Sequence, residues 1–535
     1  MNRTPVPVYP LLAAAYAVLA LVAKNLHEAI RLADVWLPLL IALAVALTGW
    51  LLAGLATRDP HRRALFSLVL VVCFVGYGVV GRRLEALALQ PAEMRDLLGF
   101  AILGGVLIAA GVLIVRARRD LASVSRFLNI ASAVLLGFPV ASIGVAFLHR
   151  ARAGPDGSWM AADVGGDAEA EEPDIYLIVL DAYTGHRTLA TDYGFDNSAF
   201  EGFLRRRGFY VPERSHANYV STFLSLSSAL NWEYLDDIPA TFGEDSRDRS
   251  IGYRRLEDNR TVRYLKDRGY RFVFVRSAYP ALSRNRHADL HIPSWQVGEF
   301  QRVWASGTAM RPIAAVACLL LRCGARALPF DPETTHQVSR KFELLAEAAR
   351  LPGPKFVFAH FLVPHEPLIY RADCTPRDDS YWPGRIDRRA DRLLRQGYVD
   401  QVRCVNRKVS ALVDRLLAAS PSPPVILLQA DHGFGRFPFG QPTRLEEADA
   451  SQIRDRTEIF AAYHLPGGAA SRMYDSITPV NAIRLVLAHY FGADLPPLED
   501  RTYWSAWAIP YRFTRIDGRT SEAVAPGTPE LGSLR

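Results

Sequence analysis

The chain has 535 residues, of which half are hydrophobic, and its net charge is +7. This length exceeds what one hydrophobic core serves, so we expect two or three folded units. The charge is modest, and no basic stripe with interleaved aromatic residues occurs, which excludes nucleic acid as a partner. The apolar excess is concentrated in the first 150 residues, as is typical of a membrane domain joined to a soluble domain.

Five apolar stretches in residues 1–150 are long enough to span a bilayer, which takes about 20 residues each. Intramembrane charges usually mark an ion or proton path, and none of the stretches contains an internal Asp, Glu or Lys. Residues 1–150 are therefore predicted to be a transmembrane anchor or a lipid-docking surface rather than a transporter. The stretches are Val8–Ala23, Val35–Ala56, Ala64–Val80, Leu97–Val115 and Phe127–Phe147.

Arginine and lysine counts in the connecting loops do not decide the orientation of the anchor. One side carries eight, namely Arg3, Arg58, Arg62, Arg63, Arg116, Arg118, Arg119 and Arg126. The other side carries seven, namely Lys24, Arg31, Arg82, Arg83, Arg95, Arg150 and Arg152. Five spans that start in the cytoplasm would place the following domain outside, which is the orientation we prefer.

The segment 151–172 is rich in Ala, Gly and acidic residues and has no periodicity, so it is predicted to be a flexible linker. From residue 173 to residue 517, apolar strands alternate with helical patterns. This alternation predicts an α/β domain with a central, mostly parallel sheet wrapped by helices. Residues 518–535 are expected to form a disordered tail.

The first strand of this domain, Ile175–Leu180, is continuously apolar, as expected for a buried central strand, and Asp181 follows at its end. A second such strand, Pro424–Gln429, is followed by Ala430 and then by Asp431 and His432. Open α/β sheets bind ligands at the carboxyl ends of their strands. If the two strands are neighbours, these two carboxylates and the imidazole converge on a metal site.

Other elements are predicted in chain order. Ile313–Leu321 is apolar but too short to span a membrane, so we expect it in a core or at an interface. Further strands are Phe272–Val275 and Phe356–His360. Helices are predicted at Asn197–Arg207, Val262–Arg268, Thr335–Ala349, Gln396–Ser420 and Pro479–Phe491.

The stretch from Ser215 to Asn231 contains a candidate nucleophile. Apolar residues recur there at helical spacing, which places Thr222 near a helix N-terminus, where free N–H groups hold anions. Beside a metal, such a hydroxyl can be ionised at neutral pH and attack phosphorus. The alternative is that the threonine and the neighbouring serines are helix caps.

Two histidines, His360 and His365, lie at the end of the strand Phe356–His360 and in the loop after it. At the ligand edge of a sheet they can bind a leaving group or a second metal. The alternative is a purely structural role, which is common for a single histidine in such a place.

The soluble domain contains four cysteines, which allow three pairings. We expect a Cys374–Cys404 disulfide and a local Cys318–Cys323 disulfide, and Cys73 is expected to be an apolar residue of the third span. Disulfides form in oxidising compartments, so this pairing places the domain outside the cytoplasm. Four unpaired thiols in the cytosol are the alternative.

The domain from residue 173 to residue 517 resembles the alkaline phosphatase and sulfatase superfamily. Its layout is most similar to the membrane-anchored branch that includes lipoteichoic acid synthases and phosphoethanolamine transferases. The resemblance covers about 330 residues, in the order of the superfamily, and Asp-His-Gly after a strand is its most specific motif. The matching segments are Leu180-Asp181, Asn218–Ser225, His360–His365, Ala430-Asp431-His432-Gly433 and Ile477–Asn481.

The resemblance implies one divalent metal ion (Zn, Mn or Ca) held by four residues, namely Asp181, Thr222, Asp431 and His432. It implies that Thr222 is covalently phosphorylated and then passes the group to an acceptor. It also implies that His360 and His365 stabilise the phosphate or protonate the leaving alkoxide, and that Asn218 touches the phosphate.

The sequence departs from the family patterns in three places. Sulfatases carry a Cys or Ser in a Cys/Ser-x-Pro-x-Arg setting, whereas Cys374-Thr375-Pro376-Arg377 has its arginine one place early and lies far past the first strand. The two-metal phosphodiesterases add an Asp and two His, but Asp-x-x-x-His does not occur and His464 lies in an expected loop, so we predict a single metal. Lipoteichoic acid synthases have Glu where this chain has Asp181, which leaves the transferred group open.

These observations predict a membrane-anchored, metal-dependent phosphoryl-group transferase or hydrolase of the sulfatase-like type, most similar to phosphoethanolamine or phosphoglycerol transferases. Its substrate is expected to be a lipid-linked or glycan phosphate ester of the cell envelope, and protein partners stay open. The expected location is the bacterial cytoplasmic membrane, with the catalytic domain in the periplasm. The alternatives are a sulfuric-ester hydrolase and a non-catalytic envelope scaffold.

Overall fold

A computed structural model of the chain describes residues 6–28, 30–86, 92–117, 120–152, 165, 172–293, 297–320, 334–381, 388–435, 442 and 444–516. The chain divides into two compact units. Unit 1 comprises Met1–Gly157 and Val297–Thr334, and unit 2 comprises Ser158–Gln296 and Thr335–Arg535. Most of the predicted linker 151–172 and the predicted tail 518–535 lie outside the described residues.

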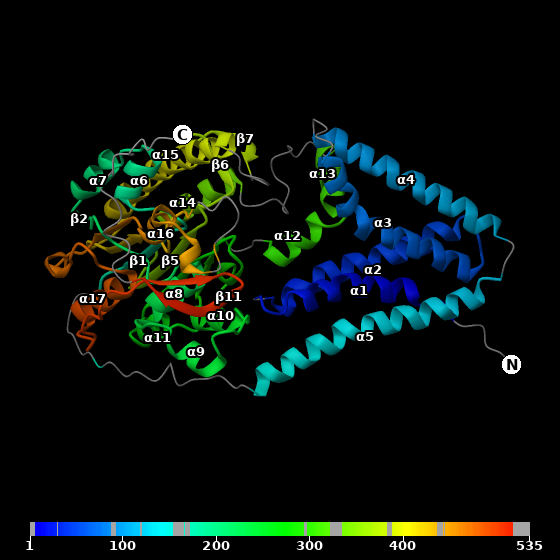
Figure 1. Cartoon of the computed structure of the whole chain (residues 1–535), viewed down its shortest axis with the longest axis horizontal. Coiled ribbons are helices and arrows are strands. Elements are labelled where there is room, and N and C mark those ends of the chain that lie inside the picture. Colours follow the sequence, from blue (N-terminus) through cyan, green and yellow to red (C-terminus); the bar gives the residue numbers. More distant parts are fainter. Residues whose placement is uncertain are drawn as a thin grey trace, which may run out of the picture. The chain divides into compact units, whose positions relative to one another are not determined.

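Unit 1 contains five N-terminal helices at the five predicted spans, and they lie side by side in the blue-to-cyan part of Figure 1. The helices α2 to α5 are long and apolar enough to cross a membrane, whereas α1 has 16 residues. The predicted N-terminal helical membrane domain is therefore confirmed. The helices are α1 (Tyr9–Lys24), α2 (Leu32–Gly54), α3 (Pro60–Ala86), α4 (Ala92–Arg116) and α5 (Ala122–Arg152).

A later part of the chain, Val297–Thr334, also belongs to unit 1 and contains α12 (Glu299–Ser306) and α13 (Met310–Leu320). Two main-chain hydrogen bonds join it to α3: Gly78 N donates to Gly307 O at 3.2 Å, and Ala309 N donates to Phe74 O at 2.9 Å. A Cβ on Gly78 would lie 2.5 Å from Gly307 O, so the contact requires glycine. The residues predicted as a core or interfacial patch, Ile313–Leu321, therefore lie largely in α13 and outside the sheet domain.

Unit 2 is built on a seven-stranded sheet in the order β2-β9-β8-β1-β5-β3-β4. The central strand β1 pairs in parallel with β5 and β8, and only β9, which is antiparallel to its neighbours β8 and β2, runs in the opposite direction, which confirms the predicted mostly parallel sheet. The strands are β1 (Ile175–Leu180), β2 (Phe209–Tyr210), β3 (Arg271–Val275), β4 (Leu290–Ile292), β5 (Lys355–Phe361), β8 (Val425–Gln429) and β9 (Ala461–His464).

The prediction of a loop around His464 is wrong. His464 is the last residue of β9, and its Nδ1 lies 2.7 Å from Pro424 O. The short segment Ala461–His464 pairs with β8 over its whole length, and this non-local pairing decides its conformation.

Helices cover both faces of the sheet, which explains why β1 is buried along its whole length. The core on one face joins alternate β1 residues to apolar side chains of α14 and α15. The predicted helices all occur: α17 has the predicted bounds, and the others have one or both ends shifted. Among the described residues, the α-helices of unit 2 are α6 (His186–Tyr193), α7 (Ser198–Arg205), α8 (Thr222–Asn231), α9 (Asp237–Phe242), α10 (Ser250–Glu257), α11 (Arg260–Asp267), α14 (Thr335–Ala348), α15 (Arg388–Ala419), α16 (Ala450–Thr457) and α17 (Pro479–Phe491).

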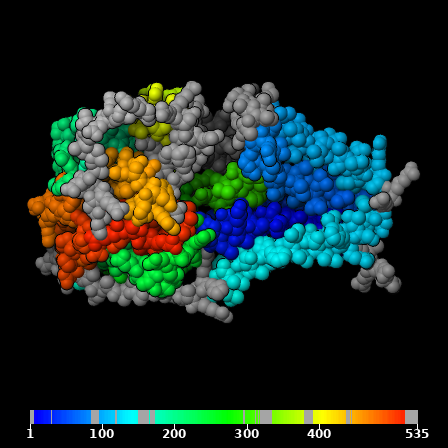
Figure 2. Space-filling view, in the orientation of Figure 1, coloured from blue at the N-terminus to red at the C-terminus, as the bar shows by residue number. Residues whose placement is uncertain are grey.

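Two antiparallel hairpins complete unit 2. The hairpin β10 (Tyr503–Ala506) and β11 (Ile509–Arg515) lies at the surface, in red in Figure 2, beside the green helical segment that includes α9. The hairpin β6 (Leu368–Tyr370) and β7 (Pro376–Tyr381) packs on α15.

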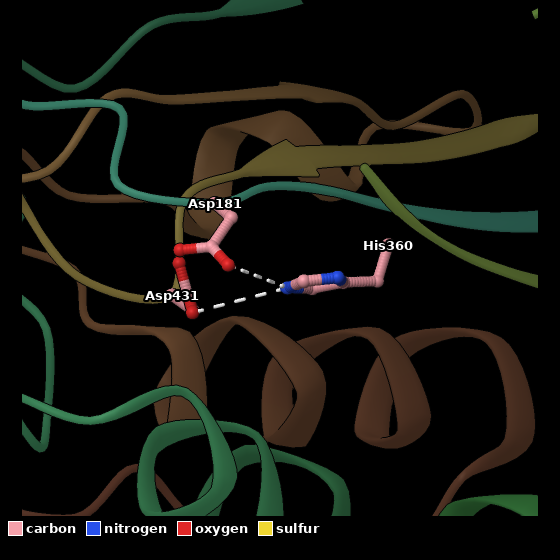
Figure 3. Close-up of side chains that lie close together, drawn as sticks. All are labelled: Asp181, His360 and Asp431. Carbon is pink, nitrogen blue, oxygen red and sulfur yellow. Dashed lines mark ion pairs between the residues drawn. The ribbon is translucent and has the colours of Figure 1, made fainter. Parts of the chain in front are cut away.

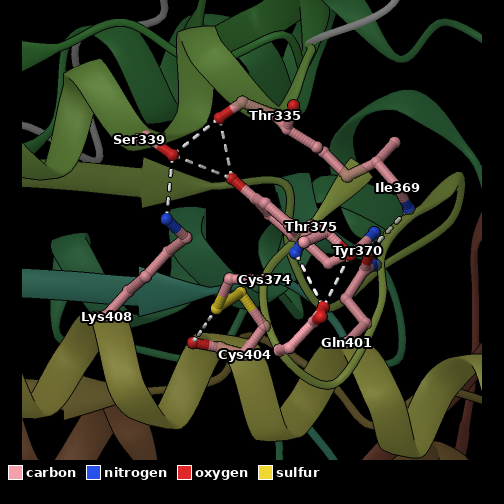
Figure 4. The surroundings of a disulfide bond; sticks show 10 residues. Thr335, Ser339, Ile369, Tyr370, Cys374, Thr375, Gln401, Cys404 and Lys408 are labelled. Atoms are coloured by element: carbon pink, nitrogen blue, oxygen red, sulfur yellow. Dashed lines mark hydrogen bonds between the residues drawn. A yellow bond between two sulfur atoms is a disulfide. The ribbon is translucent and has the colours of Figure 1, made fainter. Parts of the chain in front are cut away.

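A disulfide joins the turn of the β6–β7 hairpin to α15, which confirms the predicted Cys374–Cys404 pair. One turn before Cys404 on the same helix, Gln401, which is drawn with the disulfide in Figure 4, accepts from Ile369 N at 2.7 Å. Its amide nitrogen donates to Pro364 O at 3.0 Å and to His365 O at 2.9 Å. The disulfide thus holds the hairpin on the helix that supports the His365 loop. Cys323 and the side chain of Cys318 lie outside the described residues, so the second predicted pair stays a prediction.

We expect replacement of both Cys374 and Cys404 by alanine to lower the free energy of unfolding by about 3 kcal/mol, because a cross-link over a sequence separation of 30 restricts the unfolded chain. Thermal unfolding of the full chain in detergent measures this as a lower melting temperature. The control is Cys73→Ala in α3, which removes a free cysteine. A double variant that melts like this control would contradict the prediction.

Candidate metal centre

The ends of β1 and β8 bring two acidic residues together at one edge of the sheet. Asp181 follows β1 and Asp431 lies two residues after β8, and the two strands are parallel neighbours. Ala182 N donates to Asp431 Oδ1 at 3.2 Å, which ties the two strand ends to each other. Ala182 has a φ of +61°, in the left-handed region, where the backbone of a residue with a Cβ is strained. Tyr398 holds this backbone by donating from its hydroxyl to Ala182 O at 2.7 Å.

The Asp431 carboxylate uses its two oxygens differently. Its Oδ1 accepts hydrogen bonds from two main-chain N–H groups, those of Ala182 and of His432 (3.0 Å). Its Oδ2 is buried, has no hydrogen-bond partner among the described residues and lies 3.5 Å from His432 Nε2. The carboxylate is therefore fixed by one oxygen and presents the other to the site.

The His432 ring is oriented by the chain that follows it. Its Nδ1 lies 2.9 Å from Gly433 O, and because a carbonyl only accepts, Nδ1 carries the proton. The unprotonated Nε2 then accepts from the Thr222 hydroxyl at 3.2 Å and lies 3.6 Å from Asp181 Oδ1. Burial lowers the pKa of His432 well below its usual value, and the positive charge of Arg456 lowers it further, so the ring is neutral.

His360 belongs to the same group (Figure 3). It is in register with Val179 of β1, and its Nε2 lies 3.5 Å from Asp181 Oδ2 and 4.0 Å from Asp431 Oδ2. Its Nδ1 lies 2.8 Å from the Ser277 hydroxyl. Burial lowers the pKa of His360 to about 4, although the Asp431 charge opposes this shift. The ring is therefore a neutral imidazole at pH 7.

The residues of this group fit a divalent cation. Asp181 Oδ1, Asp431 Oδ2 and His360 Nε2 are buried and have no hydrogen-bond partner among the described residues. One ligand atom each from Asp181, His360 and Asp431 lie within 4.8 Å of one another. Burial and then the Asp431 charge raise the pKa of Asp181 well above its usual value, because two close carboxylates disfavour ionisation. A cation would remove that repulsion, and carboxylate oxygens with imidazole nitrogens suit zinc or manganese.

Thr222 is the first residue of α8, and Ser221 is its N-cap. Leu224 N and Ser225 N both donate to Ser221 O, so the helical hydrogen bonds of α8 begin at its N-cap. The Ser221 side chain makes no capping hydrogen bond. The Thr222 hydroxyl lies 3.2 Å from His432 Nε2 and Thr222 is not the N-cap of α8, so the capping alternative does not describe this residue, and its role as a nucleophile stays a prediction.

The two remaining predicted site residues lie in different surroundings. His365 lies next to the group: its N donates to Asp181 O at 3.0 Å, and its ring is 6.4 Å from that of His432. Asn218 is not brought into the group. Its side chain is engaged elsewhere, accepting from Val480 N at 3.0 Å and donating to Arg501 O at 3.0 Å.

Sequence reasoning missed three residues that support the site, namely Ser277, Tyr398 and Arg456. Ser277 follows β3 closely, at the same strand-end edge that placed Asp181, so the topology could have drawn attention to it. Tyr398 and Arg456 lie on helices, and no local pattern distinguishes them from neighbouring residues. Their contacts depend on how α15 and α16 pack.

No protein-family model and no curated protein sequence matches the chain. Several solved structures are similar to it. The C-terminal periplasmic domain of EptC from Escherichia coli matches with a TM-score of 0.40 at 14% identity, over 64% of this chain and 91% of that one. The integral membrane lipooligosaccharide phosphoethanolamine transferase A from Neisseria meningitidis matches with a TM-score of 0.38 at 12% identity, over 90% of this chain and 94% of that one.

A phosphonate monoester hydrolase of Agrobacterium radiobacter is also similar, with a TM-score of 0.39 at 12% identity, over 62% of this chain and 80% of that one. These proteins belong to the alkaline phosphatase and sulfatase superfamily, which the sequence motifs resemble. At these identities and TM-scores the matches support no conclusion about the activity of this chain. The chemistry of the centre therefore has to follow from its own residues.

Proposed function

We propose that the chain is a membrane-anchored, metal-dependent enzyme that transfers or hydrolyses phosphate esters through Thr222. One observation carries this proposal. The Thr222 hydroxyl lies 3.2 Å from His432 Nε2, and His432 Nε2 lies within 3.6 Å of a free oxygen on each of two buried carboxylates. A nucleophile and a cation site therefore share one imidazole.

Asp181, Asp431, His432 and Thr222 would hold the metal, and His360 is close enough to join them. When bound, a divalent cation lowers the pKa of a coordinated hydroxyl and offsets the negative charge that develops on the phosphoryl oxygens. The chain's own residues supply the nucleophile and the groups that bind the anion. Thr222 provides the oxygen that attacks, and α8 directs its first-turn N–H groups and the positive end of its dipole toward an anion.

The proposed reaction has two displacements at phosphorus. The Thr222 hydroxyl loses its proton and its oxygen forms a bond to phosphorus while the bond from phosphorus to the leaving alkoxide breaks, and that alkoxide takes up a proton. An acceptor hydroxyl or water then loses its proton as its oxygen attacks the same phosphorus, the bond from phosphorus to the Thr222 oxygen breaks, and Thr222 regains a proton. His365, which is buried beside His432, is the proposed group that takes up the Thr222 proton at Nε2 and passes it to the leaving alkoxide. Its Nδ1 lies 2.7 Å from Glu366 O and burial lowers its pKa, so Nε2 is the nitrogen that can accept a proton.

The residues Thr222 and Cys374 favour a phosphate ester over a sulfate ester as the substrate. The nucleophile position carries threonine, which cannot be converted to formylglycine, and Cys374 is consumed in a disulfide. The disulfide also favours an oxidising compartment, and together with a membrane anchor it supports the proposed periplasmic location of the catalytic domain. The proposed donor is a phospholipid headgroup, because the anchor keeps the enzyme in the membrane where such donors reside.

The test uses the purified full chain in vesicles that contain phosphatidylethanolamine or phosphatidylglycerol labelled in the headgroup phosphate. We expect metal-dependent release of diacylglycerol, with the label either on an added acceptor or free in solution. Hydrolysis of an aryl sulfate without turnover of any phosphodiester would support the sulfatase alternative. Absence of turnover on both substrate classes in zinc- and manganese-loaded protein would support the scaffold alternative.

A further inference from the structure

Arg456, in the last turn of α16, lies between the two loops that form the centre. Its guanidinium group donates three hydrogen bonds, all to main-chain carbonyl groups. Nε donates to Val220 O at 2.9 Å, and Nη1 donates to Gly433 O at 3.3 Å and to Phe434 O at 3.2 Å. One side chain thus spans two chain segments that are more than 200 residues apart in the sequence.

Each of these carbonyl groups lies within two residues of Thr222 or His432 in the sequence. Val220 precedes Thr222 by two residues, and Gly433 directly follows His432. Gly433 O is also the acceptor for His432 Nδ1, the contact that turns Nε2 toward Thr222. Arg456 therefore holds the carbonyl that orients the imidazole and, by its other end, the segment that carries the hydroxyl.

The main chain around Arg456 makes the same connection. Gly433 N donates to Arg456 O at 2.9 Å, and Ala217 N donates to Thr457 O at 2.9 Å. The approach to the metal loop is close, since a Cβ on Gly433 would lie 2.0 Å from Asp455 O. The end of α16 is therefore packed between the Thr222 segment and the Asp431–His432 segment, and Arg456 cannot be displaced without disturbing both.

The charge of Arg456 also acts on the centre. It lowers the pKa of Asp181, against the larger opposing effects of burial and of the Asp431 charge. Burial in turn lowers the pKa of Arg456 itself, while the Asp431, Asp181 and Asp455 carboxylates raise it. A cation beside two close carboxylates reduces their mutual repulsion before a metal arrives.

We infer that Arg456 is a positioning residue, which joins the Thr222 segment to the Asp431–His432 segment and so sets the distance between the nucleophile and the metal ligands. This inference rests on the proposed function. A guanidinium group suits the role because its planar fork holds several acceptors in fixed directions, which a lysine ammonium group does not reproduce.

The test compares Arg456→Lys and Arg456→Met with the control Arg454→Lys in the full chain. Arg454 lies on the same helix but pairs with Asp192, at 2.8 and 3.0 Å, outside the centre. We expect both Arg456 variants to bind zinc about 10- to 100-fold more weakly in a competition assay with a chromophoric chelator. We expect kcat to fall while KM changes little, because Arg456 is not proposed to touch substrate. Arg454→Lys should behave as wild type.

Hydrogen–deuterium exchange separates this inference from the proposed function. In Arg456→Lys we expect peptides that cover residues 218–224 and 431–435 to exchange faster together, with the melting temperature close to that of Arg454→Lys. If wild-type protein binds no zinc and turns over no phosphate ester, the proposed function fails. A joint loss of protection in Arg456→Lys would still support the inference that Arg456 joins the two segments. Unchanged exchange in both segments, or wild-type zinc affinity in both Arg456 variants, would overturn the inference.

Discussion

Replacement of Thr222 by alanine is expected to lower turnover of a phosphodiester donor by about 10⁴-fold or more, because it removes the atom that forms the covalent intermediate. The expected effect is large because the described residues near His432 Nε2 include no other hydroxyl at hydrogen-bond distance from it. Wild-type protein incubated with a donor labelled in its headgroup phosphate should retain label after denaturation, and Thr222→Ala should retain none. Quenched-flow sampling with mass spectrometry of the Thr222 peptide measures this directly.

Thr222→Ser is the matched variant for this experiment. It keeps the hydroxyl at the start of α8 and loses only a methyl group, so we expect it to retain label and most of the turnover. A Thr222→Ala protein that is labelled as strongly as wild type would show that another residue is the nucleophile. Equal melting temperatures of the three proteins would exclude unfolding as the cause of a loss.

Replacement of Asp431 by asparagine is expected to weaken metal binding by at least about 100-fold, and activity should fall with it. Asparagine has nearly the shape of aspartate and keeps an oxygen that can accept from Ala182 N and His432 N. It replaces the free Oδ2, which faces His432 and His360, by an uncharged NH₂ group, which cannot bind a cation. The variant therefore separates the loss of the ligand from the loss of the fold.

The measurements are metal content by mass spectrometry and zinc affinity by competition, each with the melting temperature. Asp475→Asn is the control, since Asp475 pairs with Arg214 away from the centre. Wild-type protein is expected to contain one divalent ion per chain and to lose activity on chelation. Asp431→Asn protein that binds zinc as tightly as this control would contradict the proposed ligand set.

The sequence predicted most of the fold because its strongest signals are local. The five spans are long apolar runs, and β1 and β8 are largely apolar strands that are each followed within two residues by an aspartate, so both length and composition identify them. The position of Val297–Thr334 in unit 1 could not be predicted in this way. It depends on the contact of Gly307 with Gly78, two glycines more than 200 residues apart, in which small size matters and periodicity does not.

The candidate centre was predicted in part for a similar reason. Asp181 and Asp431 follow strands, so the geometry of a parallel sheet brings them to one edge. The position of His360 was harder to predict, because its ring faces the two carboxylates only in the register that pairs it with Val179 of β1. Asn218 lies in a predicted motif, but its amide is engaged by Val480 and Arg501, which are distant in the sequence.

Anomalous scattering from crystals of the zinc-loaded protein tests the shared cation site most directly. We expect one strong peak at the zinc absorption edge, within bonding distance of Asp181, Asp431 and His432, with the Thr222 hydroxyl next to it. A peak elsewhere in unit 2, or no peak among these side chains in protein that retains activity, would contradict the account.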